Sequence, residues 1–478
     1  MGDERAQTYL RLLAERQARS SPRSGPDIAR SVEQVHWAGE ILACAGVLEE
    51  SDVDRIAGEL AAALWIRSDL ERSRSARRVG WALAAAGRPP DTDRWWWGPA
   101  SPMGITPIGR TIRVAHERAP SELHLMNLVC SPGGMVITAA MRVRWPSDGS
   151  CADLELTGAG PHLLPYEELR AADDRGTGYR VIMTGEGGAL TWQGAIGLHG
   201  TPGQHGAPGQ HGALPRARWL DLIADGTQRL VRIEVDPADV RPAGAAGPAP
   251  ADPPGERLLT WLAERILASA WDDGGPSVDP RLDELITVLT GAGALPADSP
   301  VPGRLAALCE RLGVAGHPVS APPAADLPAR WAQVMPAAAG PHGAPPGPGP
   351  EWFVPVGPAV ADLEDARFAL AGLATAGGQS FLHVVAAGRA PQVRHGQDTG
   401  LSWWVRDSGG HWHLAVVSDP HALQPGGVMG FGTAAPFRLR LTPPLRARPD
   451  RIEVVVTGRT ARARVVAPVR TDRGMPDT

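Results

Sequence analysis

Three histidines recur every six residues in one stretch of the chain, LHGTPGQHGAPGQHGALP, which places His199, His205 and His211 in a regular series. Imidazole nitrogens bind divalent transition metals, so the series could form a metal site. However, the spacers are glycine, proline and glutamine, which predict a loop tip without partners to orient the rings. The blocks TPGQHG and APGQHG differ at one residue. We therefore favour a tandem duplication of coding sequence over a metal site, and we predict no cofactor.

A second group of histidines lies in the C-terminal half. His411 and His413 are two residues apart on a predicted strand, so their side chains share one face, and His383 belongs to the preceding predicted hairpin. These rings could bind a metal or a small ligand across strands. The favoured interpretation is that they are ordinary half-buried histidines.

Tryptophan is the dominant aromatic residue, with 16 Trp against 5 Phe and 3 Tyr. Trp95, Trp96 and Trp97 precede a Pro-x-Gly turn, and Trp403 and Trp404 lie on a predicted strand. Tryptophan is enriched in protein interfaces because it combines a large apolar ring with a polar N–H group. These five residues are our candidates for a partner surface. The alternative is that Trp95–Trp97 pack a linker onto the domain that follows.

The sequence contains no nucleophile elbow, P-loop, His-Glu-x-x-His or dinucleotide-binding motif. Its Gly-Gly pairs stand between predicted strands, so they are expected to be hairpin turns and not phosphate-binding loops. This pattern favours a non-enzymatic protein. An enzyme that uses other residues between its helical and β parts stays open as a third alternative.

Composition narrows the expected environment. The net charge is −5, there is no lysine, and acidic and basic residues are interspersed along the chain. We therefore expect no nucleic-acid partner. No segment reaches the roughly 18 apolar residues of a membrane span. The N-terminus lacks the basic and then apolar pattern of a secretion signal. We therefore expect a cytoplasmic protein with no membrane contact.

The elements that would position these residues are repeated. LAER at 13–16 recurs at 262–265, AGVL at 45–48 recurs as AGAL at 292–295, and TPIG at 106–109 recurs as VPVG at 354–357. Further along, residues 177–188 match 399–410, and RIEV at 232–235 recurs at 451–454. Matches in the same order predict two tandem copies of one unit.

Each copy begins with helical periodicity and continues with strands. Helices are expected at 6–18, 28–48 and 51–70, and again at 256–271, 280–293 and 302–313. Alternating strands around glycine turns follow in both copies, which indicates an antiparallel β-sandwich. The third predicted hairpin of the second copy joins FRLRLTP to RIEVVVTG.

The plan P-[IV]-G…GG…TG…GG…P…RIEV, after a YLRLLAER start, resembles actinobacterial proteins of unassigned function. Those proteins have a helical front followed by an immunoglobulin-like or telokin-like β-sandwich. The resemblance implies a fold for each copy and carries no catalytic motif.

The predicted fold class is therefore α+β and multidomain, with two tandem units, each a helical subdomain followed by an antiparallel immunoglobulin-like β-sandwich. The expected divisions are helical subdomain 1 (1–90), sandwich 1 (95–236), a Pro/Ala/Gly linker (237–255), helical subdomain 2 (256–315), a Pro/Gly/Ala-rich linker (316–350) and sandwich 2 (351–468). The expected function is a cytoplasmic interaction or scaffold protein whose two units engage a protein partner. The alternative is a metal- or ligand-binding protein that uses the histidines.

Overall fold

A computed structural model of the 478-residue chain describes eighteen stretches. They are residues 4–20, 25–63, 104–114, 121–131, 134–143, 169–187, 191–200, 217–225, 228–235, 252–270, 281–314, 319–323, 326–338, 351–363, 366–388, 401–417, 434–458 and 462–470.

Seven helices lie in these stretches, in two groups. The first group is α1 (Glu4–Ser20), α2 (Gly25–Cys44) and α3 (Glu50–Ala63). The second group is α6 (Pro254–Ser269), α7 (Leu282–Gly291), α8 (Val301–Arg311) and α9 (Ala329–Ala338). Among the described helices, none has an apolar run long enough to cross a membrane.

The helix C-termini show that the two groups share a local structure. Two residues after the end of α2 and of α7 stands a glycine with positive φ, Gly46 at 76° and Gly293 at 73°. After each glycine the chain folds back: the N–H group of Leu48 bonds to the carbonyl of Leu42, and that of Leu295 to Leu289. This helix ending requires a left-handed residue, which glycine adopts without steric cost. The match between AGVL and AGAL is therefore structural.

The linker predicted over 316–350 contains a helix, α9. Two of its apolar side chains, Trp331 and Val334, are buried, and they belong to the same core as α6 and α8. Burial of this apolar face explains why a segment flanked by prolines and alanines folds.

The strands form two antiparallel sheets with the same order. Sheet 1 contains β1 (Gly104–Val114), β2 (Ser121–Ser131), β3 (Gly134–Val143), β4 (Leu169–Asp173), β5 (Gly178–Gly187), β6 (Thr191–Gly200), β7 (Trp219–Ala224) and β8 (Gln228–Glu234). Sheet 2 contains β9 (Trp352–Val354), β10 (Val360–Leu363), β11 (Ala366–Ala376), β12 (Gln379–Gly388), β13 (Ser402–Arg406), β14 (Trp412–Val417), β15 (Ala434–Thr442), β16 (Arg451–Thr457) and β17 (Arg462–Pro468).

The order is β1-β2-β3-β6-β5-β4-β7-β8 in sheet 1 and β10-β11-β12-β15-β14-β13-β16-β17 in sheet 2, with β9 beside β11. Position by position, each strand of sheet 1 has a counterpart in sheet 2, so β4 corresponds to β13 and β5 to β14. The N-terminal match also holds in register: Thr106 pairs with Leu128 of β2, and Val354 pairs with Leu373 of β11. The expected tandem duplication is thus present in the strand order.

Two later sequence matches align strands that are not counterparts in the two sheets. Residues 177–188 cover β5, but 399–410 cover β13, which is the counterpart of β4. RIEV lies in β8 the first time and in β16, the counterpart of β7, the second time. The predicted hairpin of β15 with β16 does not form either: β15 pairs with β12 and β14, and β16 pairs with β13 and β17.

Each unit has one continuous curled sheet, and each sheet encloses its own apolar core. In sheet 2, the segment before β10 closes onto the end of β17: the N–H group of Gly357 donates to Pro468, that of Arg470 donates to Pro355, and Val356 bridges to Val469. The fold is therefore mixed α+β with two β units. The immunoglobulin-like identity of the units stays a prediction.

The two sheets pack face to face through their outer surfaces. Small and medium apolar residues fill the contact in two patches: Ile105, Val129, Val136, Ala195, Ala369, Ala371 and Val385 in one, and Met126, Ala140, Phe353, Ala374, Ala376 and Phe381 in the other. Polar side chains also cross it. Asn127, the only asparagine, donates to the carbonyl of Val356 at 2.9 Å, and Thr138 lies 3.3 Å from the carbonyl of Ala371.

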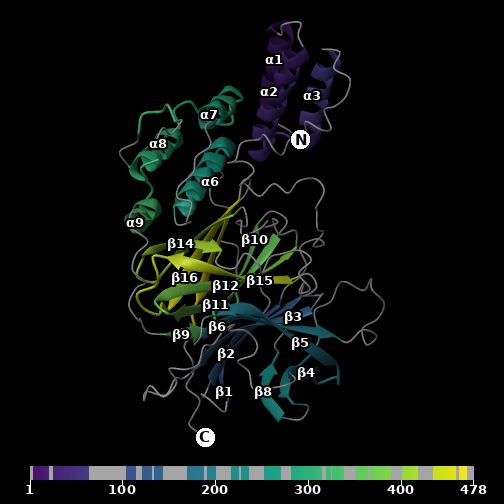
Figure 1. The fold of residues 1–478 in the computed structure, drawn as a ribbon, viewed down its shortest axis with the longest axis vertical. Helices are drawn as coiled ribbons and strands as arrows, with labels where there is room; N and C mark the ends of the chain where they lie inside the picture. The colour runs from purple at the N-terminus through teal and green to yellow at the C-terminus, as the bar shows by residue number, and fades with distance from the viewer. Residues whose placement is uncertain are drawn as a thin grey trace.

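Along the long axis of the molecule, the helices lie at one end, sheet 2 in the middle and sheet 1 at the other end (Figure 1). The first helix group packs on α7, where the Tyr9 ring lies against Gly291. Both helix groups share one core with Trp404, Leu414 and Val455 of sheet 2. Sheet 1 lies beyond sheet 2 (Figure 1). The first helix group thus packs on the helices of the second unit.

Candidate functional site

The corresponding outer faces of the two sheets carry different side chains. In sheet 2, the outer face of β13, β14 and β16 is covered by helices. Trp404 of β13 lies opposite Leu414 of β14 and Val455 of β16, and all three are buried in the helical core. The neighbours of Trp404 along the strand, Trp403 and Val405, point into the core of sheet 2.

A buried carboxylate connects the helices to this face. Glu264 of α6 has no exposed surface. One of its oxygens accepts hydrogen bonds from Arg330 and from the Trp331 indole at 3.3 Å, and the other accepts the Ser402 hydroxyl at 2.6 Å. The Trp404 indole in turn donates to Ser402 at 3.1 Å. Both carboxylate oxygens are satisfied, so this charge is held by its partners and the network fixes how helices dock on the sheet.

The corresponding face of sheet 1, on β4, β5 and β7, carries arginines. Arg170 of β4 lies opposite Arg180 of β5 and Ile223 of β7, and Ile223 lies opposite Arg229 of β8. Their sequence neighbours Ala171, Tyr179 and Leu222 point into the core of sheet 1, so this row points outward. All three arginines are exposed.

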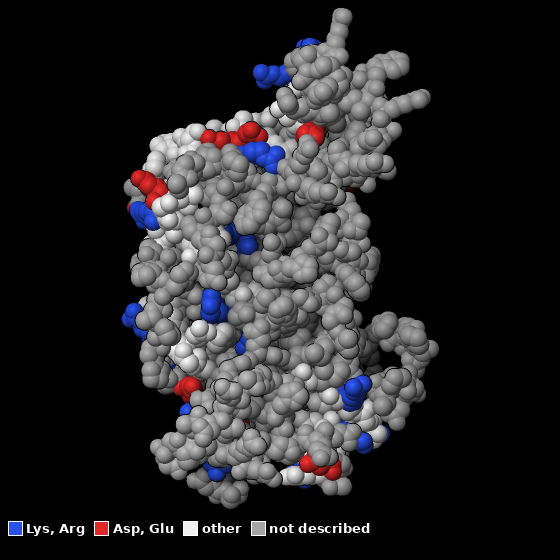
Figure 2. Space-filling model, in the orientation of Figure 1, with Lys and Arg blue, Asp and Glu red and all other residues white. Residues whose placement is uncertain are grey.

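A cluster of interacting side chains continues this face. Arg232 makes two hydrogen bonds of 2.7 Å to Asp221, and its guanidinium stacks 3.9 Å from the centre of the Trp219 ring. Arg229 also approaches Asp221, at 3.8 Å. The hydrogen bonds from Arg232 lower the pKa of Asp221. In Figure 2, blue arginine side chains lie at the lower end of the molecule, where Figure 1 labels β4 and β5. We call the outer surface of β4, β5, β7 and β8 the arginine face.

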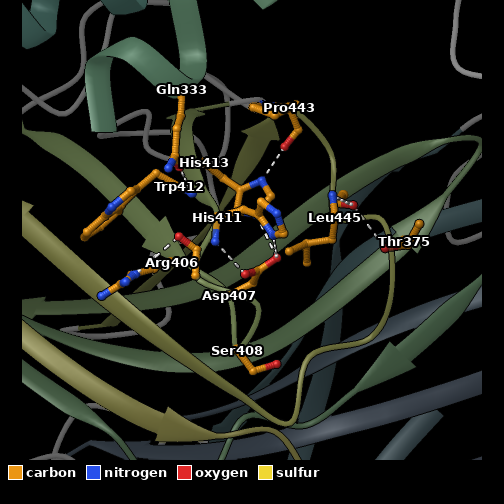
Figure 3. A network of polar contacts seen from close by, with 12 residues as sticks. Gln333, Thr375, Arg406, Asp407, Ser408, His411, Trp412, His413, Pro443 and Leu445 are labelled. Carbon is orange, nitrogen blue, oxygen red and sulfur yellow. Dashed lines mark hydrogen bonds and ion pairs between the residues drawn. The ribbon is translucent and has the colours of Figure 1, made fainter. Parts of the chain in front are cut away.

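A second polar network surrounds the β13–β14 hairpin (Figure 3). Asp407 accepts hydrogen bonds from the backbone of His411 at 2.8 Å and from its ring at 3.2 Å, and the His413 ring lies 3.5 Å away. The His413 Nδ1 atom is 2.6 Å from the carbonyl of Pro443. Gln333 of α9 accepts the backbone N–H of Trp412 at 2.9 Å, so the hairpin is also tied to a helix.

Burial governs the charges of this network. It lowers the pKa of His413, against the opposing effects of Pro443 and Asp407. Burial alone would raise the pKa of Asp407, but hydrogen bonds from His411 lower it overall. A neutral His413 donates through Nδ1 to Pro443, and a proton on Nε2 would face the Asp407 carboxylate.

His383 does not join His411 and His413. Its ring lies between the sheets, 3.2 Å from the side-chain oxygen of Gln193 in β6. Burial, together with the nearby Arg438, lowers the pKa of His383 to about 3. The predicted histidine group is thus divided: two rings share Asp407, and the third is a neutral polar contact between the two units.

Of the three metal candidates of the first unit, only His199 lies in the described residues. His199 lies within β6, opposite Arg180, and not on a loop tip. His205 and His211 lie outside the described residues. By strand order, the segment between β6 and β7 corresponds to residues 443–450, between β15 and β16. In the part of the chain that the structure describes, no group of three or more His, Cys, Asp or Glu side chains could hold a metal ion.

Of the five tryptophan candidates, the structure describes Trp403 and Trp404, and both are buried. Trp403 and Trp404 are 1% and 0% exposed, so the prediction that they form a partner surface is wrong. Trp403 packs edge-on against Phe368 and Phe437 inside sheet 2, and Trp404 lies under the helices. Helices cover one side of β13 and the core of sheet 2 covers the other, so both indoles are buried. Trp95, Trp96 and Trp97 lie outside the described residues.

Sequence reasoning missed the arginine face and Glu264. The arginines belong to three different strands, β4, β5 and β8, so only the strand order brings them together. A signal for Glu264 was present: it is the one acid in the largely apolar run LLTWLAERILA. An acid within such a run predicts a buried charge with partners.

Comparison with known proteins finds no matching family model, no matching curated relative and no matching solved structure.

Proposed function

We propose that the chain is an interaction protein that binds a protein partner on the arginine face of sheet 1. The observation that carries this proposal is the different use of one repeated surface. In sheet 2, the face of β13, β14 and β16 docks helices of the chain itself. In sheet 1, the corresponding strands present exposed Arg170 and Arg180, and the first helix group packs on α7 instead.

In sheet 2, this arrangement of strands binds helices of the chain itself. Sheet 1 has the same arrangement of strands. Relocation of the first helix group leaves its sheet with a surface of the same strand geometry but different chemistry. Sheets present such faces to partners as rigid, preorganised surfaces, which reduces the entropic cost of binding. The cytoplasmic location and the immunoglobulin-like class of each unit belong to this proposal, and rest on the sequence pattern.

Site-specific photo-crosslinking in the native host tests the proposal. A benzophenone amino acid at position 223 of the full chain is expected to crosslink one protein partner. The matched control is position 466, because Val466 is an exposed apolar residue on β17 of the other sheet, at 47% exposure. Equal crosslinking from both positions, or none from position 223, contradicts the proposal.

The alternative is a metal-binding protein that uses His199, His205 and His211. It predicts saturable zinc binding by the full chain that is lost when the three histidines are replaced by alanine. Zinc binding that is unchanged in the triple variant, or absent from the full chain, contradicts it.

A further inference from the structure

We infer that the partner segment recognised by the arginine face is an acidic amphipathic helix. This inference rests on the proposed function and names the chemistry of its partner. The starting observation is the row of Arg229, Ile223, Arg170 and Arg180 across four neighbouring strands.

The row gathers positive charge in a way that favours an anionic ligand. Arg170 and Arg180 stand directly opposite each other on adjacent strands, and like charges in this position repel. A carboxylate placed between them would accept hydrogen bonds from both guanidinium groups. Asp221 already illustrates this within the same face, since it accepts Arg232 and lies close to Arg229.

The centre of the row is apolar, which argues for a peptide over a bare polyanion. Ile223 is a half-buried residue between Arg170 and Arg229, and Trp219 lies two residues before Asp221 on β7. A partner that satisfies this surface needs apolar and acidic groups side by side. An amphipathic helix provides both, with apolar residues on one stripe and carboxylates at its border.

The spacing also fits a helix lying across the strands. Neighbouring strands are about 4.8 Å apart, so Arg170 and Arg180 are one spacing apart and Arg170 and Arg229 two. Carboxylates at positions i and i+3 of a helix are about 5 Å apart along its axis, and those at i+3 and i+10 are about 10 Å apart. Acidic residues with this period would meet the arginines in turn.

Sheet 2 offers an internal precedent for this chemistry. There the docking helix α6 brings the carboxylate of Glu264 to Ser402 of β13. The strand of sheet 1 that corresponds to β13 is β4, which offers Arg170. In sheet 1, a carboxylate of a docked helix would bond to the arginine side chain of Arg170, whereas in sheet 2 the Glu264 carboxylate bonds to the neutral hydroxyl of Ser402.

Fluorescence anisotropy with the full-length chain tests the inference. The probe is a labelled 20-residue amphipathic peptide with leucines on one stripe and glutamates at i, i+3 and i+10. We expect it to bind, and we expect Arg170→Glu/Arg180→Glu to weaken binding by at least about tenfold because attraction becomes repulsion. The control Arg446→Glu/Arg448→Glu, exposed in the segment that follows β15 of sheet 2, makes the same change in net charge. It should keep the affinity within about twofold, since distant exposed charges are screened by salt.

Three results would overturn the inference: equal loss in the control, no effect of the Arg170/Arg180 change, or equally tight binding of single-stranded DNA or of a scrambled peptide of the same composition. Thermal melts of both double variants show whether each is folded. The two proposals fail separately. A partner crosslinked at position 223 through a segment without acidic residues contradicts the acidic helix and leaves the interaction function supported.

Discussion

The Ser402 hydroxyl donates a hydrogen bond of 2.6 Å to Glu264, and this contact joins helix α6 to strand β13. The position of Glu264 in the repeated sequence LAER is occupied by Glu15 in the first copy. Glu15 is largely exposed and pairs with Arg19 on its own helix. The same motif therefore anchors a sheet in one copy and faces solvent in the other.

Removal of the buried carboxylate should destabilise the chain strongly. We expect Glu264→Ala to lower the free energy of unfolding by about 3–5 kcal/mol, because it leaves the Arg330 guanidinium without its buried partner. Ser402→Ala should cost about 1–3 kcal/mol. Urea unfolding of the full chain measures both. The matched control Glu15→Ala should change stability by about 0.5 kcal/mol or less. Similar losses for both glutamates would contradict a docking role for Glu264.

The interface between the sheets should be sensitive to acid through His383. The pKa of this histidine falls to about 3 in the folded chain, whereas an unfolded histidine has a pKa of about 6.5. Above pH 6.5 or so the ring is neutral in both states and contributes no pH dependence. As the pH falls from about 6.5 to about 3, the unfolded chain binds a proton that the folded chain does not, so stability decreases by up to about 1.4 kcal/mol per pH unit.

Unfolding measured between pH 7 and pH 5 checks this expectation. The His383→Gln variant retains a side chain able to bond to Gln193 and should show a shallower decrease than the parent. The exposed His411 provides the control, as His411→Gln. A His383→Gln variant with the same pH slope as the parent would show that His383 is not the group responsible.

The packing of the first helix group on α7 can be tested by a double-mutant cycle. A Cβ atom at Gly291 would lie 2.6 Å from the Tyr9 ring, so Gly291→Ala forces the ring to move. We expect that change alone to cost about 1–3 kcal/mol. In the Tyr9→Ala background the same change should cost much less, because the ring is gone, which gives a coupling energy of at least about 0.5 kcal/mol. Strictly additive effects would mean that these two residues do not touch.

Much of the architecture could be predicted from sequence because local patterns determine it. The repeat AGVL/AGAL corresponds to a helix ending that needs Gly46 and Gly293, and the TPIG/VPVG match aligned the first strands correctly. The alternation in β2 and β3 identified their hairpin. In each case one or two neighbouring elements supply the whole signal.

The errors arose where equivalent strands do not share sequence. β4 is only five residues long and follows a segment rich in acids, so its sequence does not identify it as a separate strand. The TG and GG turn residues around β5 then matched those around β13, one strand out of place. Short turn motifs recur at many hairpins, so they cannot fix which strand is which. The arginine face depends on that order and could not be derived from the sequence.

Hydroxyl-radical footprinting of the free full-length chain is the most direct test of the central claim, that one repeated face is covered by helices in sheet 2 and presents exposed arginines in sheet 1. We expect Trp219 to be modified readily and Trp404 to remain protected, and we expect the acidic peptide to protect Trp219. Modification of Trp404 as fast as that of Trp219, or a Trp219 already protected in the free chain, would contradict the account.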